Sequence, residues 1–283
     1  MFQISTYAYT IEYFGEYNQN FDCITAISFD GSFNQESSFL MNEPVYTEKY
    51  DGTRIDYGTR YSEVAEILIN LVKKDYTDFS RSEIRSILKW LTARKQNSWL
   101  KLYDMDGEEI CEFYGRFTMV EEQTADSRVI GFTCTFTSTH PYAFSPLRDI
   151  QQIFTGKEQI IVENDSDVVD NVVRPYMVIK PNKAISKLSI KNETTNVITY
   201  IKNIKADETL VVDNENKLAY SDDIYRTLGS DFYGDVDGFV TNYPVWIELV
   251  PGDNKLIIDT GDSSIKVEYT LKYRYPIKMG GTF

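Results

Sequence analysis

One segment of this sequence, Ser80–Arg94, has the pattern of an amphipathic helix, and no other segment has a comparably clear one. Ser80 and Glu83 have the spacing of a capping box, in which the side chain of each accepts a hydrogen bond from the main-chain amide of the other. Four apolar residues then recur at i, i+3, i+4 and i+7, and Trp90 lies on their flank: Ile84, Ile87, Leu88 and Leu91. We therefore predict a helix over residues 80–94 with one buried face and expect β-structure around it.

The neighbouring segments have the pattern of strands. Glu63–Val72 is ambiguous, because its apolar residues fit helical spacing, but its β-branched content favours a strand buried on both faces. Trp99–Asp104 and Glu109–Met119 flank an Asp-Gly turn and predict a hairpin. Val129–Thr137 alternates between apolar residues and threonines, so we predict a strand whose phenylalanine side faces the core.

Between His140 and Gly156 the alternation gives way to prolines and scattered polar residues, which is typical of a domain boundary. We predict an N-terminal β-rich domain over residues 1–148 and a C-terminal antiparallel β-sandwich over residues 149–283. The long polar insert Ser221–Asn242 is expected to form a surface loop. The expected C-terminal strands are Gln159–Val162, Arg174–Lys180, Lys187–Lys191, Val197–Ile201, Leu210–Asp213, Val245–Val250, Lys255–Asp259 and Ile265–Tyr273.

The chain is acidic, with a formal net charge of −14. This charge disfavours a fold that holds nucleic acid by neutralising many phosphates. The 3 cysteines form no C-x-x-C pair, which favours reduced thiols in the core over a disulfide framework. The N-terminus lacks the pattern of a secretion signal, and no apolar run approaches the length of a membrane span, so we expect no membrane association.

Catalytic and metal-binding patterns are weak. The single histidine, His140, is not accompanied by a Gly-x-Ser-x-Gly or His-Glu-x-x-His motif, so a turn residue is favoured over a catalytic one. Asp104-x-Asp106-Gly and Asp235-x-Asp237-Gly resemble the start of a calcium loop, but each lacks the closing acidic ligand. We expect no catalytic residue, no metal and no cofactor, and calcium at Asp235 and Asp237 is left open.

Aromatic residues gather in the predicted insert and its flank. Such rings can stack on sugars or bury themselves against a protein partner, while a loop packed by its own side chains is an equally good interpretation. The candidate contacts for a partner or a glycan are Tyr225, Phe232, Tyr233, Phe239 and Tyr243.

Taken in order, several motifs resemble the distal tail protein family of tailed bacteriophages and related tail-like particles. They are the helix Arg85–Leu91 with the strand after it, Phe113–Phe117, Gly131–Phe136 running into Pro141–Phe144, and Val245–Asn254 followed by the strand Ile265–Tyr273. The insert Ser221–Asn242 departs from the family pattern, and the first sixty residues offer no matching motif.

The resemblance implies an N-terminal β-barrel-like or β-sheet domain with one helix and a galectin-like C-terminal β-sandwich. It implies a homo-hexameric ring at the tail tip of the virion, made in the host cytoplasm, with DNA as passing cargo. Such a ring joins the tail tube protein to the hub or baseplate and to receptor-binding proteins. The exposed side of the helix then becomes a candidate contact for an acidic ring neighbour, through Arg81, Arg85 and Lys89. A solvated helix face is the other interpretation, and the sequence favours it. A carbohydrate-binding protein is the alternative, and an enzyme comes third.

Overall fold

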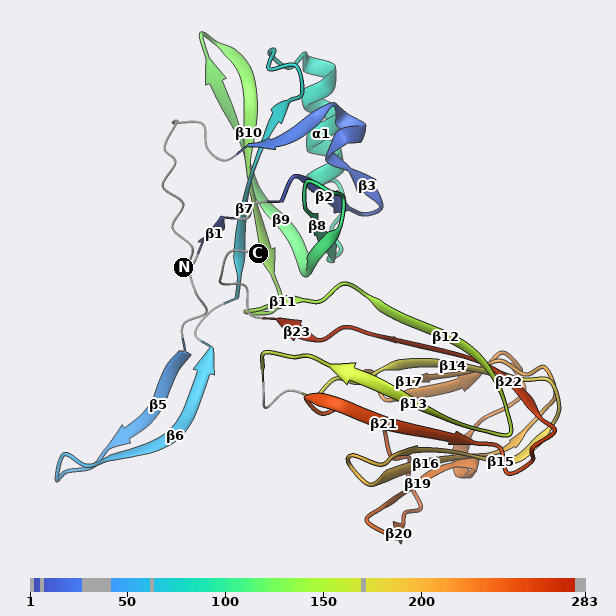
Figure 1. Cartoon of the computed structure of the whole chain (residues 1–283). Helices are drawn as coiled ribbons and strands as arrows, with labels where there is room; N and C mark the ends of the chain where they lie inside the picture. The colour runs from blue at the N-terminus through green and yellow to red at the C-terminus, as the bar shows by residue number, and fades with distance from the viewer. Residues whose placement is uncertain (1–2, 6–7, 27–41, 62–63, 169–171, 278–283) are drawn as a thin grey trace. The chain divides into compact units, whose positions relative to one another are not determined.

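The computed structural model of the chain describes residues 3–5, 8–26, 42–61, 64–168 and 172–277 (Figure 1). The chain divides into two compact units: unit 1 holds the described residues up to Pro146 together with Ile277, and unit 2 spans Leu147–Pro276. We predicted the boundary slightly later, between residues 148 and 149. The predicted fold class is confirmed, because strands dominate both units and the described residues contain a single α-helix.

Unit 1 is built on a sheet with the strand order β1-β7-β10-β9-β8-β2-β3. β1 and β4 share one edge of β7, where β1 pairs in parallel with its first half and β4 pairs antiparallel with its second half. The strands and the short 3-10 helix η1 of this unit are β1 (Gln3–Ser5), β2 (Thr10–Tyr13), β3 (Glu16–Tyr17), η1 (Asn18–Phe21), β4 (Cys23–Ala26), β7 (Glu66–Lys73), β8 (Ser98–Tyr103), β9 (Glu109–Ala125), β10 (Arg128–Ser138) and β11 (Ala143–Phe144).

The predicted helix is present as α1 (Arg81–Thr92), and its N-cap is Ser80. Both capping-box hydrogen bonds are formed, from the amide of Glu83 to Ser80 Oγ at 3.4 Å and from the amide of Ser80 to Glu83 Oε2 at 2.7 Å. The buried face differs from the prediction at Trp90, which is buried with Ile87 rather than lying on the flank. The indole donates a hydrogen bond into the core, and this partner makes burial of the polar Nε1 favourable.

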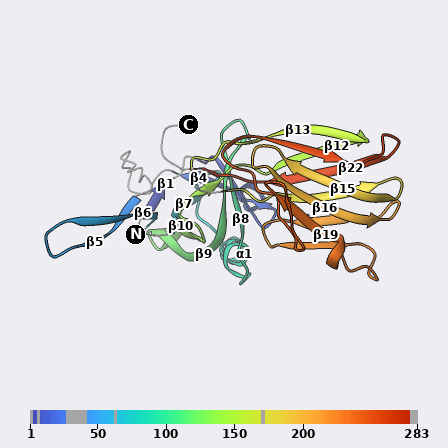
Figure 2. The same cartoon turned by 90° about the horizontal axis from the view of Figure 1, so that it is seen from below.

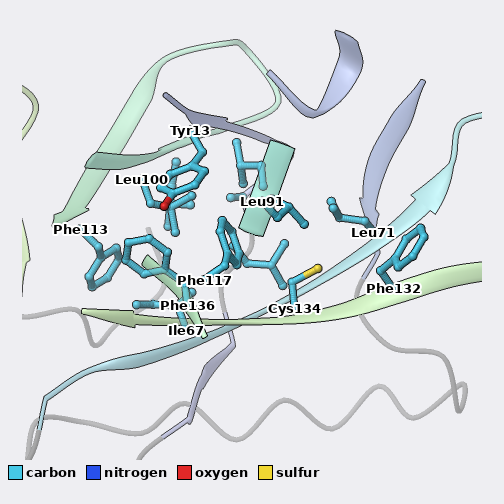
Figure 3. Close-up of a cluster of buried hydrophobic side chains, with 14 of the residues drawn as sticks. Tyr13, Ile67, Leu71, Leu91, Leu100, Phe113, Phe117, Phe132, Cys134 and Phe136 are labelled. Atoms are coloured by element: carbon cyan, nitrogen blue, oxygen red, sulfur yellow. The ribbon is translucent and has the colours of Figure 1, made fainter. Parts of the chain in front are cut away.

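Alternation along the strands supplies the rest of the unit 1 core (Figure 3). In β10 the phenylalanine side faces inward, as predicted, with Phe132, Cys134 and Phe136 fully buried. Within the predicted segment Glu63–Val72, the residues from Glu66 onward form the strand β7, while Glu63 lies outside the described residues. The strand is buried on one face only, because Leu68 and Asn70 remain half-exposed. The predicted hairpin around the Asp-Gly turn is confirmed as β8 and β9.

Two further strands, β5 (Asn42–Glu48) and β6 (Arg54–Tyr61), form a two-stranded sheet, and among the described residues they pair only with each other. At its turn the ring of Tyr50 is fully exposed, and the guanidinium of Arg54 lies 4.3 Å from the ring centroid of Tyr46. This cation–π contact bridges the two strands.

Unit 2 is the predicted β-sandwich. One sheet has the order β12-β22-β14-β17-β18, and the other has the order β13-β21-β15-β16-β19-β20. Its elements are β12 (Arg148–Thr155), β13 (Lys157–Asn164), β14 (Tyr176–Pro181), β15 (Ile185–Asn192), β16 (Val197–Ile204), β17 (Leu210–Asp213), β18 (Leu218–Ser221), η2 (Gly229–Asp231), β19 (Phe232–Val236), β20 (Phe239–Val240), β21 (Gly252–Asp259) and β22 (Lys266–Tyr273), with β23 (Pro276–Ile277) at the unit boundary. Figure 2 shows β15, β16 and β19 side by side in the second sheet.

The predicted strand Val245–Val250 is wrong. Its β-type main-chain pairing among the described residues is limited to Leu249, which forms an isolated antiparallel bridge with Val173. Buried asparagine side chains bind its main chain instead, as the amides of Asn164 and Asn192 donate to the carbonyl oxygens of Leu249 and Glu248 at 2.9 and 2.7 Å. Apolar alternation was therefore a correct guide to burial, since Ile247 and Leu249 are fully buried, but not to sheet pairing.

Candidate interaction surfaces

The outer side of α1 carries a stripe of three cations, Arg81, Arg85 and Lys89, and all three are exposed. Their i, i+4, i+8 spacing places them in one row along about 12 Å of helix. Within the described part of the chain, none of the three forms an ion pair. Like charges at this spacing destabilise a helix slightly, so an acidic partner would relieve the repulsion.

The start of α1 is fixed to the sheet by an ion pair between Lys73 Nζ on β7 and Glu83 Oε1 at 2.9 Å. The hydrogen bond from Lys73, together with those from Ser80, lowers the pKa of the Glu83 carboxyl to about 2. The same contact raises the pKa of Lys73 above its ordinary value. The pair holds the cationic stripe in a defined position on unit 1.

The predicted insert Ser221–Asn242 is not a loop throughout. It contains η2, β19 and β20, and β19 extends the second sheet by pairing with β16. Its first part is tied down by the buried ion pair of Arg226 with Glu208, whose side chains are 8% and 2% exposed. The insert is thus an ordered part of the sandwich, held by strand pairing and by an ion pair.

The five candidate aromatic residues divide into three groups. Three of them are exposed: Tyr225, Phe239 and Tyr243 leave 92%, 78% and 64% of their surface accessible to solvent. Phe232 is buried, with its ring 5.0 Å from that of Trp246, so it cannot contact a ligand in this fold and leaves the candidate set. Tyr233 is half-buried on the outer face of the second sheet.

Tyr233 belongs to a cluster that we did not predict from the sequence. Its ring centroid lies 5.0 Å from that of Tyr200 on the neighbouring strand. Lys187 Nζ lies 3.8 Å from the centroid of Tyr200, and Lys202 Nζ lies 4.5 Å from that of Tyr233. These four residues, here called the lysine–tyrosine cluster, come from β15, β16 and β19.

A shallow depression of about 520 Å³ adjoins this cluster. Lys187 and Tyr200 line one part of it, and the remainder includes four polar side chains, Ser186, Ser189, Asp259 and Asp262, together with Ala184, Thr260, Gly261 and Ile265. In β15, Lys187 and Ser189 alternate with the buried residues Leu188 and Ile190, and this alternation is visible in the sequence. The pairing of β15 with β16 and β21 is not visible there.

The aspartates of the possible calcium loop serve as turn residues. Asp235 Oδ1 accepts a hydrogen bond from the amide of Gly238 at 2.7 Å, and Asp237 Oδ1 accepts one from Asn196 Nδ2 at 3.1 Å. Over the residues that the structure describes, no group of three or more acidic, histidine or cysteine side chains could hold a metal ion. Asp104 behaves likewise, since its Oδ1 accepts from the amides of Asp106 and Glu108.

His140 lies among aromatic rings, 5.1 Å from Phe144 and 5.5 Å from Tyr142 between ring centroids, and its Nδ1 is 2.9 Å from Thr139 Oγ1. These contacts are consistent with the predicted turn residue.

Cys23, Cys111 and Cys134 are free and buried. Burial raises the pKa of the Cys23 thiol to about 12 and raises the pKa of the other two thiols as well. In the described ranges, no helix has the length and apolar character needed to cross a membrane.

Comparison with solved structures gives seven matching chains. The SPP1 Dit protein, whose crystal structure is described as a paradigm of the hub adsorption apparatus of phages that infect Gram-positive bacteria, matches with a TM-score of 0.59 and 13% identity. The match covers 93% of this chain and 98% of that chain, so the two share a fold. A chain of the phage p2 baseplate in its activated conformation with Sr matches with a TM-score of 0.46 and 10% identity, covering 94% and 97%. No curated protein matches the sequence.

Two protein families match consecutive parts of the chain. The family described as phage tail protein N-terminal domain matches residues 7–140, and the family described as phage tail C-terminal domain matches residues 142–269. The junction between them lies close to the boundary between unit 1 and unit 2. The chain therefore belongs to the phage tail protein family that is defined by these two domains.

Proposed function

We propose that this chain is a structural, non-catalytic component of a phage tail tip in the assembled virion. The observation that carries the proposal is the succession of the two tail-protein domains over nearly the whole chain. The fold shared with the SPP1 Dit protein over 98% of that chain supports the same role. A hub component needs rigid contact surfaces rather than a reactive centre, and two β-rich units with well-filled cores meet this need.

In this role the chain forms a homo-hexameric ring that joins the tail tube protein to the hub or baseplate and to receptor-binding proteins. Identical subunits close into a ring when the rotation at a head-to-tail interface divides the circle. The ring leaves a channel for DNA. The net charge of −9 over residues 1–150, from 14 basic and 23 acidic residues, supports this proposal, because an acidic channel wall repels phosphates and lets the DNA pass.

The cationic stripe on α1 is the proposed contact for an acidic ring neighbour. Arg81, Arg85 and Lys89 are exposed and form no ion pair within the described residues, so their charges are available to a partner. Charge complementarity of this kind accelerates association and fixes the register of the contact.

Tail particles that carry the labelled chain provide the direct test, and we expect imaging to place the label in a closed ring at the tail tip. Arg85→Glu should reduce incorporation into particles while the isolated chain keeps its melting temperature. Lys95→Glu, an equal charge change just outside the stripe, is the matched control and should assemble normally. A label along the tail shaft, or its absence from particles, would contradict the proposed role; normal assembly of Arg85→Glu would leave α1 as scaffold only.

Glycan binding by unit 2 is the second candidate function, and the exposure of Tyr225, Phe239 and Tyr243 favours it. Exposed aromatic rings are the groups on which proteins stack sugars and other flat or apolar ligand faces. A glycan array probed with the full chain tests this function. Specific binding that is lost in Tyr233→Ala or Tyr243→Ala would support it, and an array without any signal would count against it.

A further inference from the structure

We propose that the lysine–tyrosine cluster and the adjoining depression form a binding site for an acidic sugar residue within a glycan chain. The anionic group of the sugar would contact Lys187 and Lys202, and its hydroxyl groups would contact the polar wall of the depression. The inference rests on the second candidate function, glycan binding by unit 2, and gives it a ligand class and a location.

The first observation is the placement of the two lysines. Lys187 and Lys202 lie directly opposite each other in the antiparallel pair of β15 and β16. Like charges in this position repel each other and destabilise a sheet. Neither amine has a carboxylate within ion-pair distance among the described residues, so the two positive charges lie side by side without a direct ion pair on an otherwise acidic protein.

The second observation is that both amines are held in place. Each lies over a tyrosine ring, at 3.8 Å for Lys187 and 4.5 Å for Lys202, and the two rings are themselves packed against each other. A cation held over a ring face loses little further side-chain entropy when it binds an anion. The cluster is therefore preorganised for a single carboxylate or phosphate group.

The third observation is the mixed chemistry of the depression. Ser186 and Ser189 can donate and accept hydrogen bonds, while Asp259 and Asp262 supply carboxylate acceptors. The amide of Ser264 donates to Asp262 Oδ1 at 2.8 Å and lowers the pKa of that carboxyl, so it is an acceptor at neutral pH. Sugar hydroxyls donate to such acceptors.

This combination distinguishes an acidic sugar from a nucleic acid. Nucleic acids carry closely spaced phosphates and are bound through several cations at once. Here two cations stand beside two carboxylates, which would repel the neighbouring phosphates of a nucleic acid. A sugar that carries one anionic group and several hydroxyls fits the site, because its anion can contact the lysines and its hydroxyls can donate to the carboxylates.

Titration calorimetry on the full chain tests the proposal with three acidic probes: trigalacturonate, sialyllactose and a mannose 6-phosphate oligosaccharide. Each is paired with its neutral counterpart, namely the methyl ester, lactose and the dephosphorylated oligosaccharide. We expect at least one acidic probe to bind and its neutral counterpart to bind at least about tenfold more weakly. Lys187→Gln and Lys202→Gln should each weaken binding by about tenfold, the loss expected for one charge-assisted hydrogen bond.

Lys217→Gln is the matched control, because Lys217 is an exposed lysine that precedes β18 in the other sheet of the same unit. It should bind like the unmodified chain. The proposal is overturned if no acidic probe binds at millimolar concentration, if the neutral counterparts bind equally well, or if Lys217→Gln weakens binding as much as Lys187→Gln. Tighter binding of a short single-stranded DNA at the same lysines would also overturn it, in favour of a nucleic-acid site.

Sugar binding at the lysine–tyrosine cluster can be tested separately from the structural role of the chain in the tail tip. Particles assembled with Lys187→Gln and Lys202→Gln should still contain the chain at the tail tip. Absence of the unmodified chain from the tip would contradict the structural role and leave the calorimetric result unchanged.

Discussion

Trp90 Nε1 donates a hydrogen bond to the main-chain oxygen of Tyr13 at 3.0 Å, and this bond joins α1 to β2 across 77 positions of sequence. Both side chains are buried, and the indole ring also stacks on Phe21 with 4.6 Å between centroids. A single side chain thus connects the helix, a strand and the 3-10 helix η1. The contact identifies Trp90 as the residue through which the helix is oriented on the sheet.

Trp90→Phe should lower the free energy of unfolding by about 1–3 kcal/mol, because it leaves the buried oxygen of Tyr13 without its donor. Denaturant unfolding followed by circular dichroism measures the change. Ser86→Ala, at an exposed position of the same helix, is the control and should stay within about 0.5 kcal/mol. Equal effects of the two substitutions would mean that the hydrogen bond contributes nothing measurable.

Asn214 makes two buried hydrogen bonds, donating to the oxygen of Pro175 at 2.6 Å and accepting from the amide of Ile247 at 2.8 Å. Asn214→Ala should therefore destabilise unit 2 by about 2 kcal/mol, because the buried amide of Ile247 loses its acceptor and the oxygen of Pro175 keeps only the 3.4 Å bond from the main-chain amide of residue 214. Asn216→Ala, in the exposed turn nearby, should cost less than about 1 kcal/mol. Thermal unfolding of both variants checks the difference, and a mild effect at Asn214 would show that water replaces its amide.

The ion pair of Lys73 and Glu83 predicts a defined acid sensitivity. The pKa of Glu83 falls from 4.5 to about 2 on folding, so the stability that this carboxylate contributes is complete above pH 4.5 and is lost as the pH falls toward 2. Glu83→Gln should flatten the dependence of unfolding free energy on pH in that window. Glu121→Gln, on an exposed part of β9, should keep the original slope; identical slopes in all three proteins would refute the linkage.

Gly115 lies in β9 where the neighbouring strand approaches closely. A Cβ atom there would lie 2.1 Å from the carbonyl oxygen of Thr137 and 2.8 Å from Cα of Ser138. Gly115→Ala should destabilise unit 1 by about 1–3 kcal/mol or more, because backbone atoms cannot move aside as a flexible side chain can. Thr118→Ala, three positions along the same strand, is the comparison in a melting experiment. A melting temperature that Gly115→Ala leaves unchanged would mean that the two strands can separate there at little cost.

The elements that local chemistry determines could be predicted from the sequence. The helix start follows from Ser80 and Glu83, which bond to each other, and the inward face of β10 from Phe132 to Phe136 follows from the alternation of apolar residues with threonines. The preference for a strand over a helix in the predicted segment Glu63–Val72 is confirmed from Glu66 onward, although the second face of the strand is not buried.

The features that depend on long-range partners could not be predicted. Val245–Val250 has the alternation of a strand, yet its main chain is bound by asparagines that lie 33 to 85 positions earlier in the chain. Burial of Phe232 depends on Trp246, and the lysine–tyrosine cluster depends on the register of three strands. Periodicity reports which side of a segment is apolar, but not which segment faces it.

The three buried cysteines all belong to unit 1, and unit 2 has none. Because their thiols are shielded and their pKa values are raised, a thiol reagent can modify them only after unit 1 opens. The rate of modification therefore reports the rate at which unit 1 opens. The natural sequence thus allows the opening of unit 1 to be followed without any added label, and a change confined to unit 2 leaves this rate unaffected.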